Sequence, residues 1–199
     1  MAKLDLVKEY KSYYKAGRKP EIVEFQEAGY LSTEGRGEPA GEVFVSKVEA
    51  LYPLAYGIKK ICKDQGADFG VPKLEGLWWV EGETPALEVP RKEWCWKLLI
   101  RMPDFVTEKM MAFVQPEVAR KKKNELIREI SFEKMTAGKC VQIMHIGPYA
   151  TEPDTINSLM EFMAENGLSE NGLHHEIYLS DPRKTEPSKM KTLIRYPVK

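Results

Sequence analysis

The sequence has few cysteines, no long hydrophobic run and no excess of either charge. Its three cysteines, Cys62, Cys95 and Cys140, are far apart and odd in number, so we expect neither a disulfide framework nor a metal cluster. Cys95 lies between two tryptophans in a strand pattern, which favours a buried, inert thiol because reactivity requires an exposed, electropositive setting. No window approaches the roughly 18 apolar residues that cross a membrane, and the first residues lack the apolar region of a signal peptide. We therefore expect a cytoplasmic protein with no membrane partner.

The charge balance argues against nucleic acid as the main partner. Thirty basic residues match thirty acidic ones, so the chain lacks the broad positive field that supports non-specific binding to DNA. One basic run, residues 120–123, follows a helical pattern. We interpret it as a solvated helix C-terminus rather than a DNA contact, since cations suit that end of the helix dipole.

Motifs for cofactors and metals are also lacking. The chain has no phosphate-binding glycine-rich loop, no dinucleotide fingerprint and no serine-containing elbow. His145 and the pair His174 and His175 have no carboxylate or cysteine at a diagnostic ligand spacing beside them. We therefore expect no cofactor and no metal. His145 precedes a Gly-Pro turn and is predicted to end a strand and hold the loop, with Tyr149 on that loop able to reach a ligand.

An internal repeat is the most informative feature that the chain does have. Residues 97–103 (KLLIRMP) are echoed by residues 191–197 (KTLIRYP), and Pro-Arg-Lys precedes both, at 90–92 and 182–184. Each half is predicted to run strand, helix, strand, strand. A solenoid would need at least ~3 repeats. With 199 residues, 43% of them hydrophobic, the chain can bury a sizeable core, and we expect one duplicated α+β domain.

The predicted organisation follows the repeat. The domain comprises an N-terminal arm (1–20), a first module (21–103), a connecting helix (104–124) and a second module (125–199). The first predicted helix covers residues 44–62 and is kinked or broken at Pro53. The second covers residues 105–123 and is interrupted at Pro116. The third begins at a capping box at 151–154 and ends at Gly167. Predicted strands are 22–26, before a loop at 33–41, then 74–80, 94–102, a hairpin of 131–135 and 139–146, 174–180 and 191–198.

Strand parity sorts the candidate site residues of the second module, because alternate side chains point to opposite faces. His175 and Ile177 share the more apolar face, which we expect to cover the helix. Glu176 and Tyr178 share the other face. A carboxylate beside aromatic groups in a dry cleft can bind a cation or act as a base. In the alternative, Glu176 lies exposed and pairs with Lys191 or Arg195.

Four tryptophans gather between residues 78 and 96. In a regular strand Trp78 and Trp79 point to opposite faces, whereas Trp94 and Trp96 share one. At least three of the four could therefore lie near one sheet surface and form an aromatic platform. The alternative is that all four are ordinary core aromatics, since tryptophans are usually mostly buried.

Three segments resemble a known family. Residues 74–79 (LEGLWW), 142–149 (QIMHIGPY) and 174–183 (HHEIYLSDPR) are similar to the stand-alone GyrI-like small-molecule-binding proteins, and the resemblance covers nearly the whole chain. It implies two modules related by a pseudo-twofold axis, a concave antiparallel sheet with helices on one face, and a ligand groove between the modules. In relatives fused to DNA-binding domains, the module senses hydrophobic, often cationic drugs, with a glutamate matching Glu176 in the pocket. No helix-turn-helix precedes the module here, so we do not expect a transcription factor.

The same resemblance implies a function. Some stand-alone members are cyclopropanoid cyclohydrolases, which detoxify DNA-alkylating compounds by adding water to a strained cyclopropane. Glu176 would then orient or deprotonate the water, and Tyr149 or Tyr178 would hydrogen-bond the dienone oxygen. The predicted contacts to a hydrophobic or planar small molecule are Trp78, Trp79, Trp96, His145 and Tyr178. The alternatives are a non-catalytic protein that sequesters such ligands and a topoisomerase inhibitor. Nothing in the sequence predicts the oligomeric state.

Overall fold

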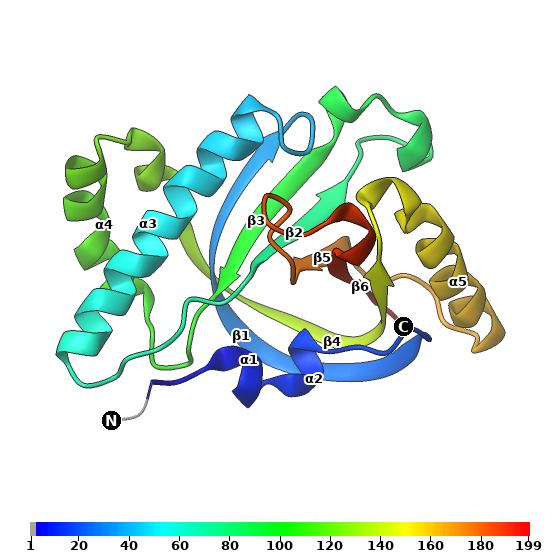
Figure 1. Ribbon diagram of the computed structural model, residues 1–199, viewed down its shortest axis with the longest axis horizontal. Helices are drawn as coiled ribbons and strands as arrows, with labels where there is room; N and C mark the ends of the chain where they lie inside the picture. Colours follow the sequence, from blue (N-terminus) through cyan, green and yellow to red (C-terminus); the bar gives the residue numbers. More distant parts are fainter. Residues whose placement is uncertain (1–2) are drawn as a thin grey trace. The chain divides into compact units, whose positions relative to one another are not determined.

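A computed structural model describes residues 3–199 as a mixed α+β protein with antiparallel strands (Figure 1). Two short helices, α1 (Leu6–Glu9) and α2 (Lys11–Tyr14), come first. The main elements follow in the order β1 (Glu21–Arg36), α3 (Glu42–Asp64), β2 (Leu74–Trp79), β3 (Cys95–Arg101), α4 (Glu108–Lys122), β4 (Ser131–Ile146), α5 (Glu152–Glu165), β5 (His174–Tyr178) and β6 (Lys191–Pro197). Five short 3-10 helices lie in the connections: η1 (Ala86–Glu88), η2 (Arg91–Glu93), η3 (Glu125–Glu129), η4 (Tyr149–Thr151) and η5 (Pro187–Lys189).

The chain divides into two compact units. Unit 1 comprises the chain up to Glu9, Ala28–Pro72 and Gly76–Met135, and unit 2 comprises Tyr10–Glu27, Lys73–Glu75 and Thr136–Lys199. The order strand, helix, strand, strand occurs twice, in β1-α3-β2-β3 and in β4-α5-β5-β6, as the sequence predicts. That the two sets are symmetric duplicates stays a prediction.

In unit 1, the second half of β1 pairs with β3. The strands are antiparallel, from Tyr30 opposite Arg101 to Arg36 opposite Cys95. Helices α3 and α4 pack together beside them (Figure 1). Gly57 allows this close approach, because a Cβ there would lie 2.6 Å from Cγ2 of Val118.

Helix α3 confirms the predicted amphipathic stripe. Its buried residues are Ala50, Leu51, Leu54, Ala55, Ile58 and Cys62. The helix runs on through Pro53, so the predicted break is wrong. Proline removes one backbone hydrogen bond, and the apolar stripe around it holds the helix together.

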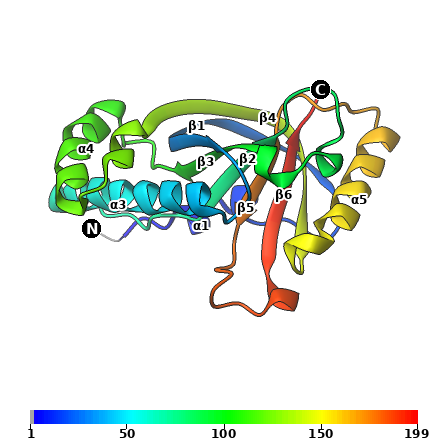
Figure 2. The same cartoon turned by 90° about the horizontal axis from the view of Figure 1, so that it is seen from above.

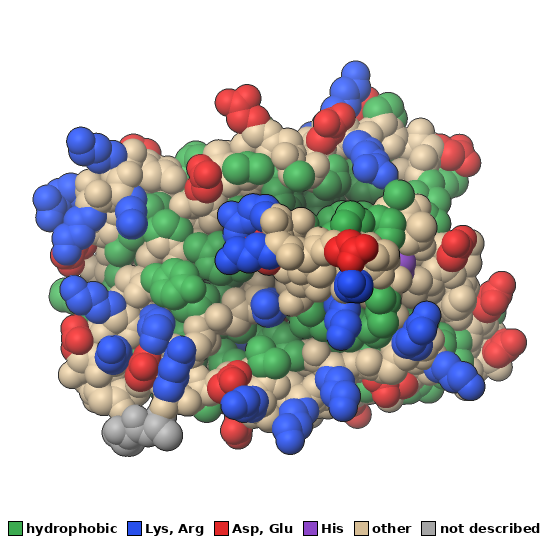
Figure 3. Space-filling view, viewed as in Figure 1, with side chains coloured by type: hydrophobic (Ala, Val, Ile, Leu, Met, Phe, Trp, Pro, Cys, Tyr) green, Lys and Arg blue, Asp and Glu red, His purple; other side chains and the backbone are tan. Residues whose placement is uncertain are grey.

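Helix α4 likewise continues through Pro116, where an interruption was predicted. The basic run ends this helix, with Arg120 to Lys122 in its last turn, and Lys121 pairs with Glu117 at 2.5 Å. On the face shown in Figure 3, Lys and Arg side chains are interspersed with Asp and Glu.

In unit 2, strand β6 lies between β4 and β5. It is antiparallel to both, with Ile194 opposite Ile143 of β4 and opposite Glu176 of β5. Helix α5 lies alongside these strands (Figure 2). The cluster that it buries against the sheet consists of Val141, Ile143, Leu159, Met163, Ile194, Tyr196 and Val198.

The other face of this sheet carries a fully buried cation. The guanidinium carbon of Arg195 lies 4.3 Å from the ring centre of Tyr13 and 4.1 Å from that of Phe25. Arg195 donates hydrogen bonds to the Tyr13 carbonyl at 2.7 Å and to Oε1 of Gln142 at 2.8 Å. Gln142 in turn donates to the Ser12 carbonyl at 3.2 Å. These contacts fasten the arm segment (residues 10–20) to the sheet.

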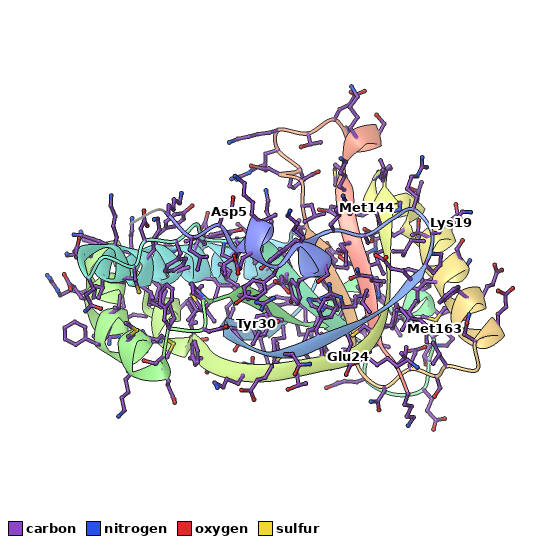
Figure 4. The ribbon with its side chains drawn as sticks, turned by 90° about the horizontal axis from the view of Figure 1, so that it is seen from below. Asp5, Lys19, Glu24, Tyr30, Met144 and Met163 are labelled. Carbon is purple, nitrogen blue, oxygen red and sulfur yellow. The ribbon has the colours of Figure 1, made fainter. Side chains whose placement is uncertain are left out.

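A second buried contact joins the arm segment to β5. The Tyr13 hydroxyl donates to Oε2 of Glu75 at 2.5 Å, and Nε2 of His175 lies 2.8 Å from the same oxygen. Burial lowers the pKa of His175, so its neutral ring donates Nε2–H to the carboxylate. Figure 4 shows this side of the molecule, with Lys19 on the arm segment, Glu24 on β1, Met144 on β4 and Met163 on α5.

Two predicted loops are strand in the structure. Strand β1 extends to Arg36, so the loop predicted from Thr33 begins too early. Residues 131–146 form the single strand β4, and the predicted hairpin is wrong. Gly138 has φ +62, a left-handed conformation that lets the strand bend without reversing.

Removing the buried cation tests its structural role. Arg195→Leu leaves Gln142 and the Tyr13 carbonyl without their donor, so we expect the free energy of unfolding to fall by about 3 kcal/mol or more. The matched control is Arg183→Leu, because the Arg183 side chain is 83% exposed in its ion pair with Asp181; that change should cost less than about 1 kcal/mol. Urea denaturation measures both, and equal losses would contradict this role.

Candidate functional site

The register of β5 and β6 decides which side chains of β5 face helix α5. Glu176 lies opposite Ile194, and Tyr178 lies opposite Thr192. Residues directly opposite each other in an antiparallel pair share a face. Because Ile194 packs against α5, Glu176 and Tyr178 lie on the face that the helix covers.

The predicted assignment of the two faces is therefore wrong. The alternation of residues along the strand predicts that the more apolar face, with His175 and Ile177, lies under the helix. In the structure His175 lies opposite Arg195 and shares the face to which the arm segment is fastened. The more apolar face of β5 therefore lies on the side of the buried Arg195 guanidinium and not under α5.

Glu176 forms a short hydrogen-bonded chain on the helix face. Its Oε1 lies 2.7 Å from Nε2 of His174, and Nδ1 of His174 lies 2.7 Å from the Tyr196 hydroxyl. Glu176 is only 9% exposed. The alternative that it lies exposed and pairs with Lys191 or Arg195 is wrong.

A second glutamate, which the sequence analysis missed, lies beside this chain. Glu152 is the first residue of α5 and is 7% exposed. Its carboxyl hydrogen-bonds Thr192, which lies opposite Tyr178, and its Oε1 has no hydrogen-bond partner within residues 3–199. Burial, and then the charge of Glu176, raise the pKa of Glu152 to about 9. At neutral pH Glu152 is therefore protonated in this dry site, beside the carboxyl group of Glu176.

Nothing in the local pattern marks Glu152 as a site residue. Its position in the sequence Thr-Glu-Pro-Asp predicts a capping box at residues 151–154, and this prediction is wrong. Thr151 caps no backbone amide, and its hydroxyl donates instead to the Pro148 carbonyl at 2.9 Å. The Thr-Glu-Pro sequence signals only that a helix begins there, with proline in its first turn.

Two tyrosines border the carboxyl pair. The rings of Tyr149 and Tyr178 meet edge to face with their centres 6.2 Å apart. Tyr149 is 39% exposed, and the partial burial of its hydroxyl, and then the charges of Glu176 and Glu152, raise its pKa to about 12. Its hydroxyl stays protonated at neutral pH and can donate a hydrogen bond. Tyr149 and Tyr178 thus lie together near Glu176, although their roles toward a ligand stay predictions.

His145 holds the loop that carries Tyr149. Its Nδ1 lies 2.8 Å from the Thr155 hydroxyl on α5, and its Nε2 lies 3.2 Å from the Pro148 carbonyl. This confirms the predicted role at the end of the strand. His145 is 3% exposed, and its predicted contact with a ligand stays a prediction.

The tryptophans gather in unit 1 around Phe44. Its ring stacks on Trp78 with centres 5.9 Å apart and meets Trp96 edge to face at 5.2 Å. Trp94 contacts Trp78 edge to face at 6.1 Å. Three of the four tryptophans therefore form one aromatic cluster, as parity suggests.

Burial differs among these rings. Trp96 is fully buried over Gly35, where a Cβ would lie 2.2 Å from the indole, and its N–H donates to the Gly37 carbonyl at 3.2 Å. Trp78 is 8% exposed, and Trp79 is half-buried. The contacts of Trp78, Trp79 and Trp96 with a ligand stay predictions.

The part of the chain that the structure describes shows neither a metal site nor a membrane-crossing helix. From residue 3 onward, no group of three or more His, Cys, Asp or Glu side chains is arranged to hold a metal ion. No helix there combines the length and apolarity that a membrane crossing requires. Cys95 is buried, as predicted, and burial raises the pKa of its thiol; that this thiol is inert stays a prediction.

Comparisons with known proteins agree with a ligand-binding site. The model of the GyrI-like small molecule binding domain family matches residues 18–199. An uncharacterized conserved protein from Listeria innocua is 40% identical, with a TM-score of 0.92, over 99% of this chain and 100% of its own. Two hydrolase structures from the same organism are 40% and 41% identical, with TM-scores of 0.87 and 0.89, over 99% and 100% of this chain and all of theirs.

A more distant structure shares the fold alone. The EcmrR C-terminal domain is 19% identical, with a TM-score of 0.58, over 91% of this chain and 97% of its own. No curated protein matches the chain.

The protonated state of Glu152 has a consequence for stability. Its pKa in the folded protein, about 9, lies above the value of 4.5 for an unperturbed glutamate. The unfolded chain therefore ionises first, and the free energy of unfolding falls as the pH rises from about 4.5 to 9. Glu152→Gln keeps a neutral group at every pH, so its stability relative to wild type should increase over this window, by up to about 1.4 kcal/mol per pH unit.

Urea denaturation at pH 5 and pH 8.5 measures this difference. The control is Glu161→Gln, at an exposed position of the same helix, whose difference from wild type should not change between the two pH values. If Glu152→Gln behaves like this control, Glu152 is ionised at neutral pH and the assignment fails.

Proposed function

Because the chain belongs to the GyrI-like small molecule binding domain family, we propose that it is a cytoplasmic hydrolase that opens cyclopropanoid genotoxins by adding water. The observation that carries the proposal is the pair of buried carboxyl groups of Glu176 and Glu152 on one face, where burial and the charge of Glu176 raise the pKa of Glu152 to about 9. Two relatives of about 40% identity over the whole chain are described as hydrolases, which supports the reaction class.

The pair supplies both proton transfers that the reaction needs. Glu176 accepts a proton from water as the water oxygen bonds to the strained methylene carbon. The bond between that carbon and the ring breaks, and its electron pair passes into the conjugated dienone, whose oxygen becomes a phenolate. Glu152 gives its proton to this oxygen, so the product is a phenol and the pair still holds one proton. Exchange with solvent returns that proton to Glu152.

The tyrosines assist at the developing negative charge. With a pKa of about 12, the Tyr149 hydroxyl stays protonated and can donate a hydrogen bond to the dienone oxygen as it becomes a phenolate. The edge-to-face pair of Tyr149 and Tyr178 offers an aromatic contact to a planar substrate. The strain of the three-membered ring already lowers the barrier, so one base and one acid suffice.

A non-catalytic binding protein is the second candidate. The carboxylate of Glu176 beside Tyr149 and Tyr178 is also a suitable environment for a planar cation. Such a protein would hold its ligand unchanged. Glu176→Gln would weaken the binding of cations and leave the binding of neutral planar compounds intact.

A time course with a cyclopropapyrroloindole-type compound, followed by liquid chromatography and mass spectrometry, separates the two functions. We expect the wild-type protein to form a water adduct, about 18 Da heavier, over many turnovers. Glu176→Gln should lower kcat at least ~100-fold and Glu152→Gln at least ~10-fold, since each removes one proton transfer. Glu161→Gln, on the exposed side of α5, is the matched control and should stay within about 2-fold of wild type.

Two results would contradict the proposed hydrolysis. If the compound binds to the wild-type protein and to Glu176→Gln but stays unchanged beyond the uncatalysed rate, the protein is a binding module. A rate unaffected by either glutamate substitution would place any hydrolysis elsewhere.

A further inference from the structure

A chain of three side chains ends at the proposed base. The Tyr196 hydroxyl lies 2.7 Å from Nδ1 of His174, and Nε2 of His174 lies 2.7 Å from Oε1 of Glu176. The rings of His174 and Tyr196 meet edge to face with centres 5.0 Å apart. The side chains of His174 and Glu176 are only 15% and 12% exposed. All three residues lie on neighbouring strands, β5 and β6, and on one face of them.

One order of donors and acceptors satisfies both hydrogen bonds of this chain. Burial, and then the charges of Glu170 and Glu176, hold the pKa of Tyr196 above its usual range, so its hydroxyl keeps its proton. In this order the phenol donates to Nδ1, and the ring carries a proton on Nε2. That proton points at Glu176. Both hydrogen bonds are satisfied in this one tautomer.

We propose that His174, held between the Tyr196 hydroxyl and Glu176, is the positioning residue that orients the Glu176 carboxylate toward the attacking water. This proposal rests on the proposed hydrolysis, because it names the residue that orients Glu176, the base of that reaction. His174 donates to Oε1, so Oε2 is the oxygen that accepts the water proton. The hydrogen bond also fixes the plane of the carboxylate, which would otherwise sample several rotamers of a flexible side chain.

Three substitutions separate this role from simple packing. His174→Gln keeps an N–H donor near the position of Nε2 and loses the acceptor for Tyr196. His174→Leu keeps the bulk and loses both. Tyr196→Phe keeps the ring that packs on α5 and removes only the hydroxyl that bonds Nδ1.

The expected results form a series in kcat at constant KM. We expect His174→Leu to lower kcat ~100-fold, and His174→Gln and Tyr196→Phe to lower it ~3-fold to 10-fold, with KM within about 2-fold of wild type, because the substrate does not bond to His174. If His174 only filled space, kcat would not be higher in His174→Gln than in His174→Leu. Equal losses for Leu and Gln, or losses in KM instead of kcat, would overturn the proposal.

A second measurement keeps the proposal independent of turnover. Nitrogen-15 NMR of the histidine rings in the ligand-free protein reports the tautomer of His174, and His174→Gln identifies its signals. We expect the Nε2–H form in wild type, and in Tyr196→Phe a shift of the Nδ1 signal alone, because only the hydrogen bond at Nδ1 is lost. The Nδ1–H form in wild type would overturn the proposal. If the wild type shows the expected tautomer but no ring opening, the positioning of Glu176 stands and the proposed hydrolysis fails.

Discussion

The burial of the Arg195 guanidinium is the constraint on which the arrangement of unit 2 depends. A buried cation is tolerated only where other groups compensate its charge. Here Gln142 and the Tyr13 carbonyl accept hydrogen bonds from Nε and Nη2, and two aromatic rings contact the guanidinium, while Nη1 has no hydrogen-bond partner within residues 3–199. A slip of β6 by one residue would turn every side chain to the other face and place this charge under α5. Arg195 therefore fixes the register in which Thr192, Ile194 and Tyr196 face the helix, and pairing with β6 carries Glu176 to that face.

The same register brings two carboxyl groups into one dry site. Glu152 enters from the first turn of α5 and bonds Thr192, while Glu176 lies on the neighbouring strand. Two adjacent carboxyls out of water do not both ionise cheaply, so the pair holds a proton at a pH where isolated glutamates have none. A site with one acid and one base can add water across a strained bond without a metal or cofactor, which is the type of reaction that the proposal assigns. The hydroxyls of Tyr149 and Tyr196 keep their protons for the same reason, since burial and the nearby carboxylates raise both pKa values.

Local patterns in the sequence predicted the elements well and the long-range partners poorly. The repeat located β3 and β6, the apolar stripe located α3, and parity correctly grouped Glu176 with Tyr178. The choice of face was wrong because counting apolar residues on β5 says nothing about Arg195, whose partners come from Tyr13, Phe25 and Gln142. Glu152 was missed because its burial depends on Thr192 and Glu176, which follow later in the chain. The hairpin was wrongly predicted because a glycine suits both a turn and a bend within a strand, and only the pairing of β4 with β6 distinguishes them.

The protonation of Glu152 in the ligand-free protein tests the central claim most directly. Carbon-13 NMR of protein labelled at the glutamate carboxyl carbons distinguishes a neutral carboxyl from a carboxylate at pH 7, and Glu152→Gln identifies the signal by its loss. The account predicts that Glu152 gives a neutral signal at pH 7 that moves to the carboxylate position as the pH is raised through about 9. A Glu152 signal already at the carboxylate position at pH 7 would contradict the pairing of one acid with one base in this site.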